Sequence, residues 1–251
     1  MYKLMSNKLR TEIKDLRTKN ILQIYRACLK LKYFDPKFFT HLNAQIRKRI
    51  KYVFPKDLIA CCAANIACKS QDSEAFTKSM ISHIQKADLI GNLRTKDLVN
   101  LLVLTYEALK LDFTPVFKEE INNIADQTID RFMLEQRKFI SIQKRQEKMP
   151  QEGENVETKR LTLFYVNNFL RNLLLLERYD QAVIAFIQDI LSEKCILAAK
   201  DILFIITYSL QVHKKTNFLK DSELEEILIP CFISLENNLT KVNFILKSFT
   251  N

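Results

Sequence analysis

The chain has 251 residues, of which only two are glycine and five are proline. Folds built on sheets or phosphate-cradling loops need glycine at their tight turns, so this composition argues against sandwiches, barrels, dinucleotide-binding sheets and P-loop sites. The formal net charge is +10, and the excess lies in residues 1–60, which hold 15 Lys and Arg against 4 Asp and Glu. Such a basic field attracts a polyanion, either nucleic acid or an anionic membrane surface, unless it only keeps the surface solvated.

The N-terminal stretch 1–11 contains three basic residues and no acidic one. This pattern is typical of an organelle-targeting segment, or of what remains of one. The most apolar later run, residues 195–210, is interrupted by Lys200 and Asp201. A membrane span needs about 20 predominantly apolar residues, so we expect no membrane insertion.

Three stretches share one pattern, in which a turn residue precedes a Lys, an Asn or Asp, and an apolar helical run. The Asn or Asp is Asn20, Asp57 and Asp97, so the repeats lie 37 and 40 residues apart. An Asn or Asp there can cap the helix or act as a first-turn anion. Similar starts at 158–161 and 199–202 extend the series. These periods predict an all-α fold, an α-solenoid of about five helical hairpin repeats.

The first hairpin shows the expected internal division. Apolar residues follow the 3.6-residue helical period from Ile21 to Leu29. Asp35 and Pro36 then predict a break, because Pro can open the second helix and Asp can cap it. Further along, the helical pattern runs from 115 to 148 without a breaker, which predicts an over-long, protruding second helix that leaves the body of the solenoid.

Residues 149–157 form the one convincing linker, because they hold one of the two glycines and one of the five prolines. We therefore expect an N-terminal basic repeat segment, 1–148, and a C-terminal repeat segment, 158–251. The two segments can still stack as one array.

Nothing in the sequence marks a catalytic or metal site. Six cysteines lie in apolar surroundings without a C-x-x-C pair, which predicts small buried side chains in a reducing compartment. Three histidines are scattered without the paired spacing of a zinc site, so we expect neither a metal nor a cofactor. Cys61 and His83 could meet across one hairpin, but such a pair is far more often packing than a catalytic dyad. We therefore expect that the protein is not an enzyme.

The basic residues form a pattern of their own. Lys19, Gln23, Arg26 and Lys30 recur at helical spacing and line one face of the first repeat helix. The next helix ends in the basic run 47–51, where the macrodipole favours each cation by about 0.3–1 kcal/mol. That effect explains one or two of these charges, but not four in five residues.

Lysines near the predicted helix starts need a different explanation, because they face the positive end of the macrodipole. Equivalent ends of stacked repeats align, so Lys19, Lys56 and Lys96 are expected to form a row. A phosphate backbone would account for such a row. The predicted nucleic-acid-binding residues are Lys14, Arg17, Lys19, Arg26, Lys30, Lys37, Arg47, Lys48, Arg49, Lys51, Lys56, Arg94 and Lys96.

The stretch Thr18–Phe39 resembles the helical repeats of organellar RNA-binding proteins. These are the FAST-kinase-like and RAP-domain proteins, abundant in apicomplexan parasites and related to octotricopeptide-type arrays. The helix openings Phe54–Leu58 and Arg94–Leu98 repeat the pattern. The resemblance covers residues 16–120 well and 158–251 loosely. This sequence departs from the family in lacking a C-terminal RAP-type pattern, which puts any nuclease-like role of that domain in doubt.

The resemblance implies a location in the mitochondrial matrix and a role in RNA metabolism. Its most concrete form is a structural component of the mitochondrial ribosome, with rRNA bound by the basic N-terminal region and neighbouring proteins of the assembly bound by the rest. A stability or processing factor for mRNA or tRNA is one alternative. A protein-interaction scaffold in an organellar complex is the other.

Overall fold

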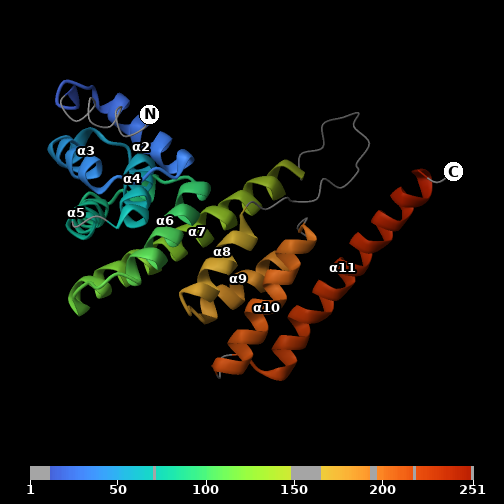
Figure 1. Ribbon diagram of the computed structural model, residues 1–251. Coiled ribbons are helices and arrows are strands. Elements are labelled where there is room, and N and C mark those ends of the chain that lie inside the picture. The colour runs from blue at the N-terminus through green and yellow to red at the C-terminus, as the bar shows by residue number, and fades with distance from the viewer. Residues whose placement is uncertain (1–11, 70–71, 148–164, 193–196, 217–218, 250–251) are drawn as a thin grey trace. The chain divides into compact units, whose positions relative to one another are not determined.

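The computed structural model describes residues 12–69, 72–147, 165–192, 197–216 and 219–249 (Figure 1). Within these ranges the chain forms ten α-helices and two short 3-10 helices, and no strand. The prediction of an all-α fold is therefore confirmed. The chain divides into two compact units, Met1–Arg131 and Phe132–Asn251.

The first unit begins with three successive helical hairpins, the last of which runs on into the long helix α7. Two 3-10 turns, η1 and η2, precede the second and third hairpins. The elements are α2 (Thr18–Leu31), α3 (Pro36–Lys48), η1 (Ile50–Tyr52), α4 (Pro55–Cys68), α5 (Ser73–Lys86), η2 (Ile90–Asn92), α6 (Thr95–Leu109) and α7 (Pro115–Glu147).

The helix boundaries follow local chemistry. Pro36 opens α3, and Asp35 caps it by accepting a hydrogen bond from the Phe38 amide at 3.1 Å, as the sequence predicts. At the other end, α2 and α4 each stop at a lysine in the left-handed region, Lys32 with φ 52° and Lys69 with φ 49°. Such a residue ends the helix because its backbone N–H turns back to satisfy free carbonyls of the last turn.

The first helices of the three hairpins pack in series, α2 against α4 and α4 against α6. Arg26 of α2 forms an ion pair with Asp57 near the start of α4, whereas Cys28 interacts with Cys68 at its end. Since later residues of α2 meet later residues of α4, the two helices run in the same direction. The second helix α3 packs against the next second helix, α5.

A buried polar network joins the first two hairpins. The Tyr25 hydroxyl donates to Asn43 Oδ1, and Asn43 Nδ2 donates to Asn65 Oδ1 at 2.7 Å and to Asp72 Oδ2 at 2.9 Å. Arg47 Nη2 in turn donates to Asp72 Oδ1 at 2.8 Å. The buried side chains of this network, Tyr25, Asn43 and Asn65, therefore all have hydrogen-bond partners, which is the condition for burying such groups without a large penalty.

The second unit starts in the C-terminal half of α7. Its other helices are α8 (Val166–Leu175), α9 (Gln181–Ser192), α10 (Ala199–Lys215) and α11 (Asp221–Phe249). Phe132 of α7 stacks on Phe169 at 4.0 Å between ring centroids, and Phe186 packs edge-on against both. Helix α10 packs against α8 and α11, so it holds this unit together.

Helix α7 confirms that residues 115 to 147 are continuously helical, but its part from Phe117 to Ile140 does not protrude. Buried side chains lie along it from Phe117 to Ile140, so each unit uses part of this helix in its core. The two units meet in sequence at Arg131 and Phe132, within α7. The predicted linker 149–157 and the predicted fourth helix start at 158–161 lie outside the described residues.

Candidate nucleic-acid interface

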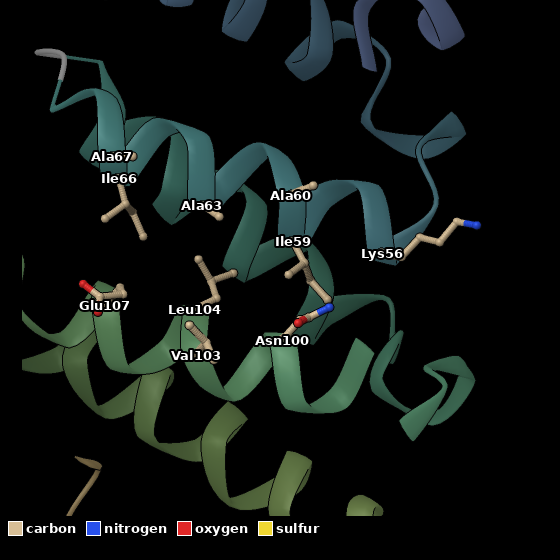
Figure 2. A pocket seen from close by; sticks show the side chains of 10 residues that line it. All are labelled: Lys56, Ile59, Ala60, Ala63, Ile66, Ala67, Asn100, Val103, Leu104 and Glu107. Carbon is tan, nitrogen blue, oxygen red and sulfur yellow. The ribbon is translucent and has the colours of Figure 1, made fainter. Parts of the chain in front are cut away.

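The starts of α2, α4 and α6 form one edge of the first unit. In each helix the second residue is a lysine, Lys19, Lys56 and Lys96, and all three are exposed. Figure 2 shows that α4 and α6 also run in the same direction, because Ile59 lies opposite Asn100 and the later residue Ile66 lies opposite the later residue Glu107. The three lysines therefore stand at the same end of three helices that pack in series.

The same edge lacks capping side chains. The N-cap residues of α2, α4 and α6 are Arg17, Phe54 and Arg94, each in extended backbone and none with a side-chain hydrogen bond to its helix. A Ser, Asp or Asn there would stabilise a helix by about 1 kcal/mol. The sequence left open whether Asn20, Asp57 and Asp97 cap their helices or lie in the first turn. Each is the third residue of its helix. They are first-turn residues and not N-caps.

The outward faces of the three parallel helices differ in chemistry. At four equivalent positions, the residues of α2 are basic or polar, those of α4 are mainly alanine, and those of α6 are mixed. At equivalent positions they are Lys19, Gln23, Arg26 and Lys30 on α2; Lys56, Ala60, Ala63 and Ala67 on α4; and Lys96, Asn100, Val103 and Glu107 on α6. A pocket of about 370 Å³ lies between the last two faces (Figure 2). The basic stripe is therefore confined to α2, while the row of lysines at the helix starts extends over all three helices.

Three of the predicted arginines are already engaged within the protein. Arg26 is paired with Asp57, and Arg47 is paired with Asp72 at 2.8 Å while its guanidinium lies 5.7 Å from the centre of the Phe76 ring. Arg49 donates to the backbone carbonyls of Lys14 and Leu16. The basic run 47–51 is thus not one surface. Its arginines, Arg47 and Arg49, stabilise the fold through contacts within the protein, whereas its lysines, Lys48 and Lys51, are exposed.

The contact made by Arg49 also gathers cations. It holds the turn at Lys14 against the end of α3, which places Lys14 beside the region that carries Lys48 and Lys51. Lys30 is exposed in the last turn of α2, and Lys37 is exposed in the first turn of α3. Neither belongs to the row of helix starts.

Two residues of this edge were missed by the sequence analysis. Tyr52, at the end of η1, is 80% exposed, and Phe54, just before α4, is 71% exposed. Val53 between them is buried. The available signal was the run from Lys51 to Lys56, in which two aromatic residues stand on either side of the aliphatic Val53 and a lysine lies at each end.

The cysteines of the described segments do not form a reactive site. Cys28, Cys61, Cys62, Cys68 and Cys231 are buried, as the sequence predicts. Burial raises the pKa of the Cys61 thiol well above its usual value, so the thiolate is disfavoured there. In the same segments no cluster of His, Cys, Asp and Glu is placed to hold a metal ion. Cys195 lies outside them.

Comparisons with family models, curated proteins and solved structures find no match to this chain. Across the described helices, none combines the length and apolar character that spanning a membrane requires.

Proposed function

We propose that this protein is a non-catalytic RNA-binding protein of the helical-repeat class, and that the helix starts of its first unit contact RNA phosphates. The observation that carries the proposal is the repeated use of one edge: α2, α4 and α6 each begin with an exposed lysine and without a capping side chain. One such start would be unremarkable. Three in series, each against the local preference of a helix N-terminus, indicate that the edge has a purpose other than stability.

The chemistry fits a polyanion. Lys19, Lys56 and Lys96 are exposed, and the described residues provide none of them with an ion-pair partner. Adjacent packed helices lie about 8–10 Å apart, so the three lysines span roughly 20 Å. Binding then releases the counterions of the phosphates that the lysines neutralise, which makes affinity steeply dependent on salt.

The finer architecture is part of the same proposal. The serial packing of α2, α4 and α6, with α3 against α5, is the arrangement expected of an α-solenoid built from hairpins. Helix α10 starts with Ala199-Lys200-Asp201, the same order of residue types as α4 and α6. These features support an array of about five hairpins, as the repeat period predicts.

The most concrete form of the proposal is a component of the mitochondrial ribosome that contacts rRNA. The resemblance of Thr18–Phe39 to organellar RNA-binding repeats supports it. Ultraviolet crosslinking in cells, followed by sequencing of the attached RNA, separates the possibilities. Discrete sites in mitochondrial rRNA would support the ribosomal role, and sites in mRNA or tRNA would indicate a processing or stability factor.

Binding measured with purified protein tests the edge itself. We expect the variant Lys19→Gln, Lys56→Gln and Lys96→Gln to bind RNA more weakly and to reduce the slope of log affinity against log salt by about 2 to 3. The matched control is Lys86→Gln, Lys214→Gln and Lys220→Gln, which removes the same charge from exposed lysines elsewhere. Equal slopes for both variants would refute the proposed edge.

A protein-interaction scaffold is the second candidate, favoured by the pocket between α4 and α6. The half-buried Ala60 and the exposed Ala63 and Ala67 leave room for a partner's helix to approach closely. If crosslinking recovers no RNA and affinity purification recovers one protein, this candidate replaces the first. The change Ala63→Glu should then release that protein.

A further inference from the structure

We infer that the rings of Tyr52 and Phe54 form a stacking platform for unpaired nucleobases, so that the RNA bound at this edge is single-stranded. The inference rests on the proposed function and names the class of RNA. These two are the most exposed large hydrophobic side chains of the described part of the chain, at 80% and 71%. Rings of this size normally gain stability by burial, so two largely exposed ones so close together in the chain indicate a surface that stacks on a ligand.

The backbone fixes the two rings relative to each other. Val53 is extended, with φ −102° and ψ 126°, and its side chain is buried. In extended chain, residues on either side of a central one project to the same side, here away from the core, about 7 Å apart along the backbone. Because Val53 is buried, the side chains of Tyr52 and Phe54 both point toward solvent and lie next to each other.

The rings are surrounded by cations. Lys51 and Lys56 flank them in the sequence, and both are exposed. Phe54 is the N-cap of α4, and the equivalent positions of α2 and α6 are Arg17 and Arg94. Because these helices pack in series, one arginine lies about one helix spacing, roughly 8–10 Å, on each side of Phe54.

Cations for the backbone together with aromatic rings for the bases are the combination that binds single strands. A duplex keeps the faces of its bases stacked on one another, so the rings would have nothing to contact in it. The arrangement is less suited to a membrane surface. Interfacial anchors bury the apolar face of a helix, whereas these rings stand on a short turn between lysines.

The test compares two fluorescein-labelled RNAs, a 20-nucleotide oligouridylate and a 20-base-pair duplex of mixed sequence, by anisotropy at several salt concentrations. We expect the full chain to bind oligouridylate more tightly than the duplex. The variant Tyr52→Ala with Phe54→Ala should lose about 10- to 100-fold in affinity for oligouridylate, with an unchanged salt slope. Its affinity for the duplex should stay within about threefold of the unmodified protein, since the rings have no role there.

The matched control is Tyr52→Phe with Phe54→Tyr, which keeps both rings and should bind oligouridylate as the unmodified chain does. Circular dichroism melting shows whether either variant is folded, and because both side chains are exposed, the midpoint should shift by no more than about 2 °C. A variant that melts early is replaced by Tyr52→Gln with Phe54→Gln, which keeps side-chain bulk without a ring.

The outcomes distinguish the stacking platform from the phosphate-binding edge. If RNA binds with the expected salt dependence but the alanine variant is unaffected, or the duplex binds as tightly as the single strand, the stacking platform is refuted and the phosphate-binding edge stands. If neither RNA binds at low salt, the proposed function fails and the inference fails with it. If vesicles of phosphatidylserine and phosphatidylcholine bind through the two rings and oligouridylate does not, the ligand is a lipid surface and the inference is overturned.

Discussion

Asn43 of α3 and Asn65 of α4 meet by a 2.7 Å hydrogen bond, with both side chains fully buried. Asn65 Nδ2 also donates to the Cys61 carbonyl at 2.9 Å, which orients its amide so that Oδ1 faces Asn43. One amide therefore links its own helix to the preceding hairpin. Around it, Tyr25 and Asp72 complete their hydrogen bonds through Asn43.

Replacing Asn43 by Leu should destabilise the protein by about 2 to 4 kcal/mol, because the change leaves Tyr25 and Asn65 buried without their partner. Urea unfolding followed by circular dichroism measures the loss. Asn20→Ala is the control, since Asn20 is exposed and should change stability by less than about 0.5 kcal/mol. Equal stabilities of the two variants would mean that the network contributes nothing.

A capping residue at the proposed RNA-binding edge should raise stability and lower affinity. We expect Arg94→Asp to stabilise the protein by about 1 kcal/mol, because the new carboxylate accepts first-turn N–H groups of α6. The same change places a negative charge where RNA phosphates are proposed to bind, so RNA affinity should fall.

The reverse change at a helix that is already capped calibrates this effect. Asp35→Ala removes the 3.1 Å hydrogen bond to the Phe38 amide and should cost about 1 kcal/mol without weakening RNA binding. Thermal melts of the two variants should therefore move in opposite directions relative to the unmodified chain, and RNA titrations should show weaker binding for Arg94→Asp alone. A destabilised Arg94→Asp would show that Arg94 supports the fold.

Arg49 and Lys48 are neighbours in the sequence and should behave differently. Arg49→Gln removes charged hydrogen bonds to the carbonyls of Lys14 and Leu16 and should cost about 1.5 to 3 kcal/mol. Lys48→Gln should leave stability within about 0.5 kcal/mol and reduce RNA affinity. Hydrogen exchange supplies an independent check, because only Arg49→Gln should speed exchange of the Leu16 amide, which is bonded to the Ile13 carbonyl at 3.4 Å.

Alkaline pH should destabilise the protein through its buried thiols. Burial raises the pKa of Cys28 and of Cys231 from 9.0 to about 11. Below pH 9 each thiol is protonated in both states, and stability is unaffected. Above pH 9 the unfolded thiols ionise while the folded ones stay protonated, so the free energy of unfolding falls as pH rises toward 11. Urea unfolding under reducing conditions should show this decline.

A variant that removes the two thiols checks the cause. Cys28→Ala with Cys231→Ala should lose less stability between pH 8 and pH 11 than the unmodified protein. An identical decline would assign the effect to other groups, such as Tyr25, whose pKa is raised well above 10 by burial.

Most of the helical framework was predictable because its signals are local. Pro36 and Asp35 define the start of α3, and the Lys-Asp pattern lies in the first turn of α4, α6 and α10. The division inside α7 was not predictable, since no breaker marks it and each unit buries its own part of one continuous helix.

The candidate site was only partly predictable, because the role of a basic side chain depends on remote partners. Arg47 is paired with Asp72, 25 residues away, and Arg49 bonds to Leu16, 33 residues away. No local pattern separates them from Lys48. The exposed rings were missed for a related reason, since Tyr-Val-Phe is normally a sequence that packs inward, and only the buried Val53 shows which way this turn faces.

The lysines at the starts of α2, α4 and α6 give salt two opposing effects on the same molecule. Each of these cations is repelled by the positive end of its own helix, and added ions screen that repulsion. Added salt should therefore raise the melting temperature of the free protein, while it lowers the affinity of the protein for a polyanion. A bound phosphate chain would supply the same screening locally, so the edge that binds it would become more rigid at the moment of binding.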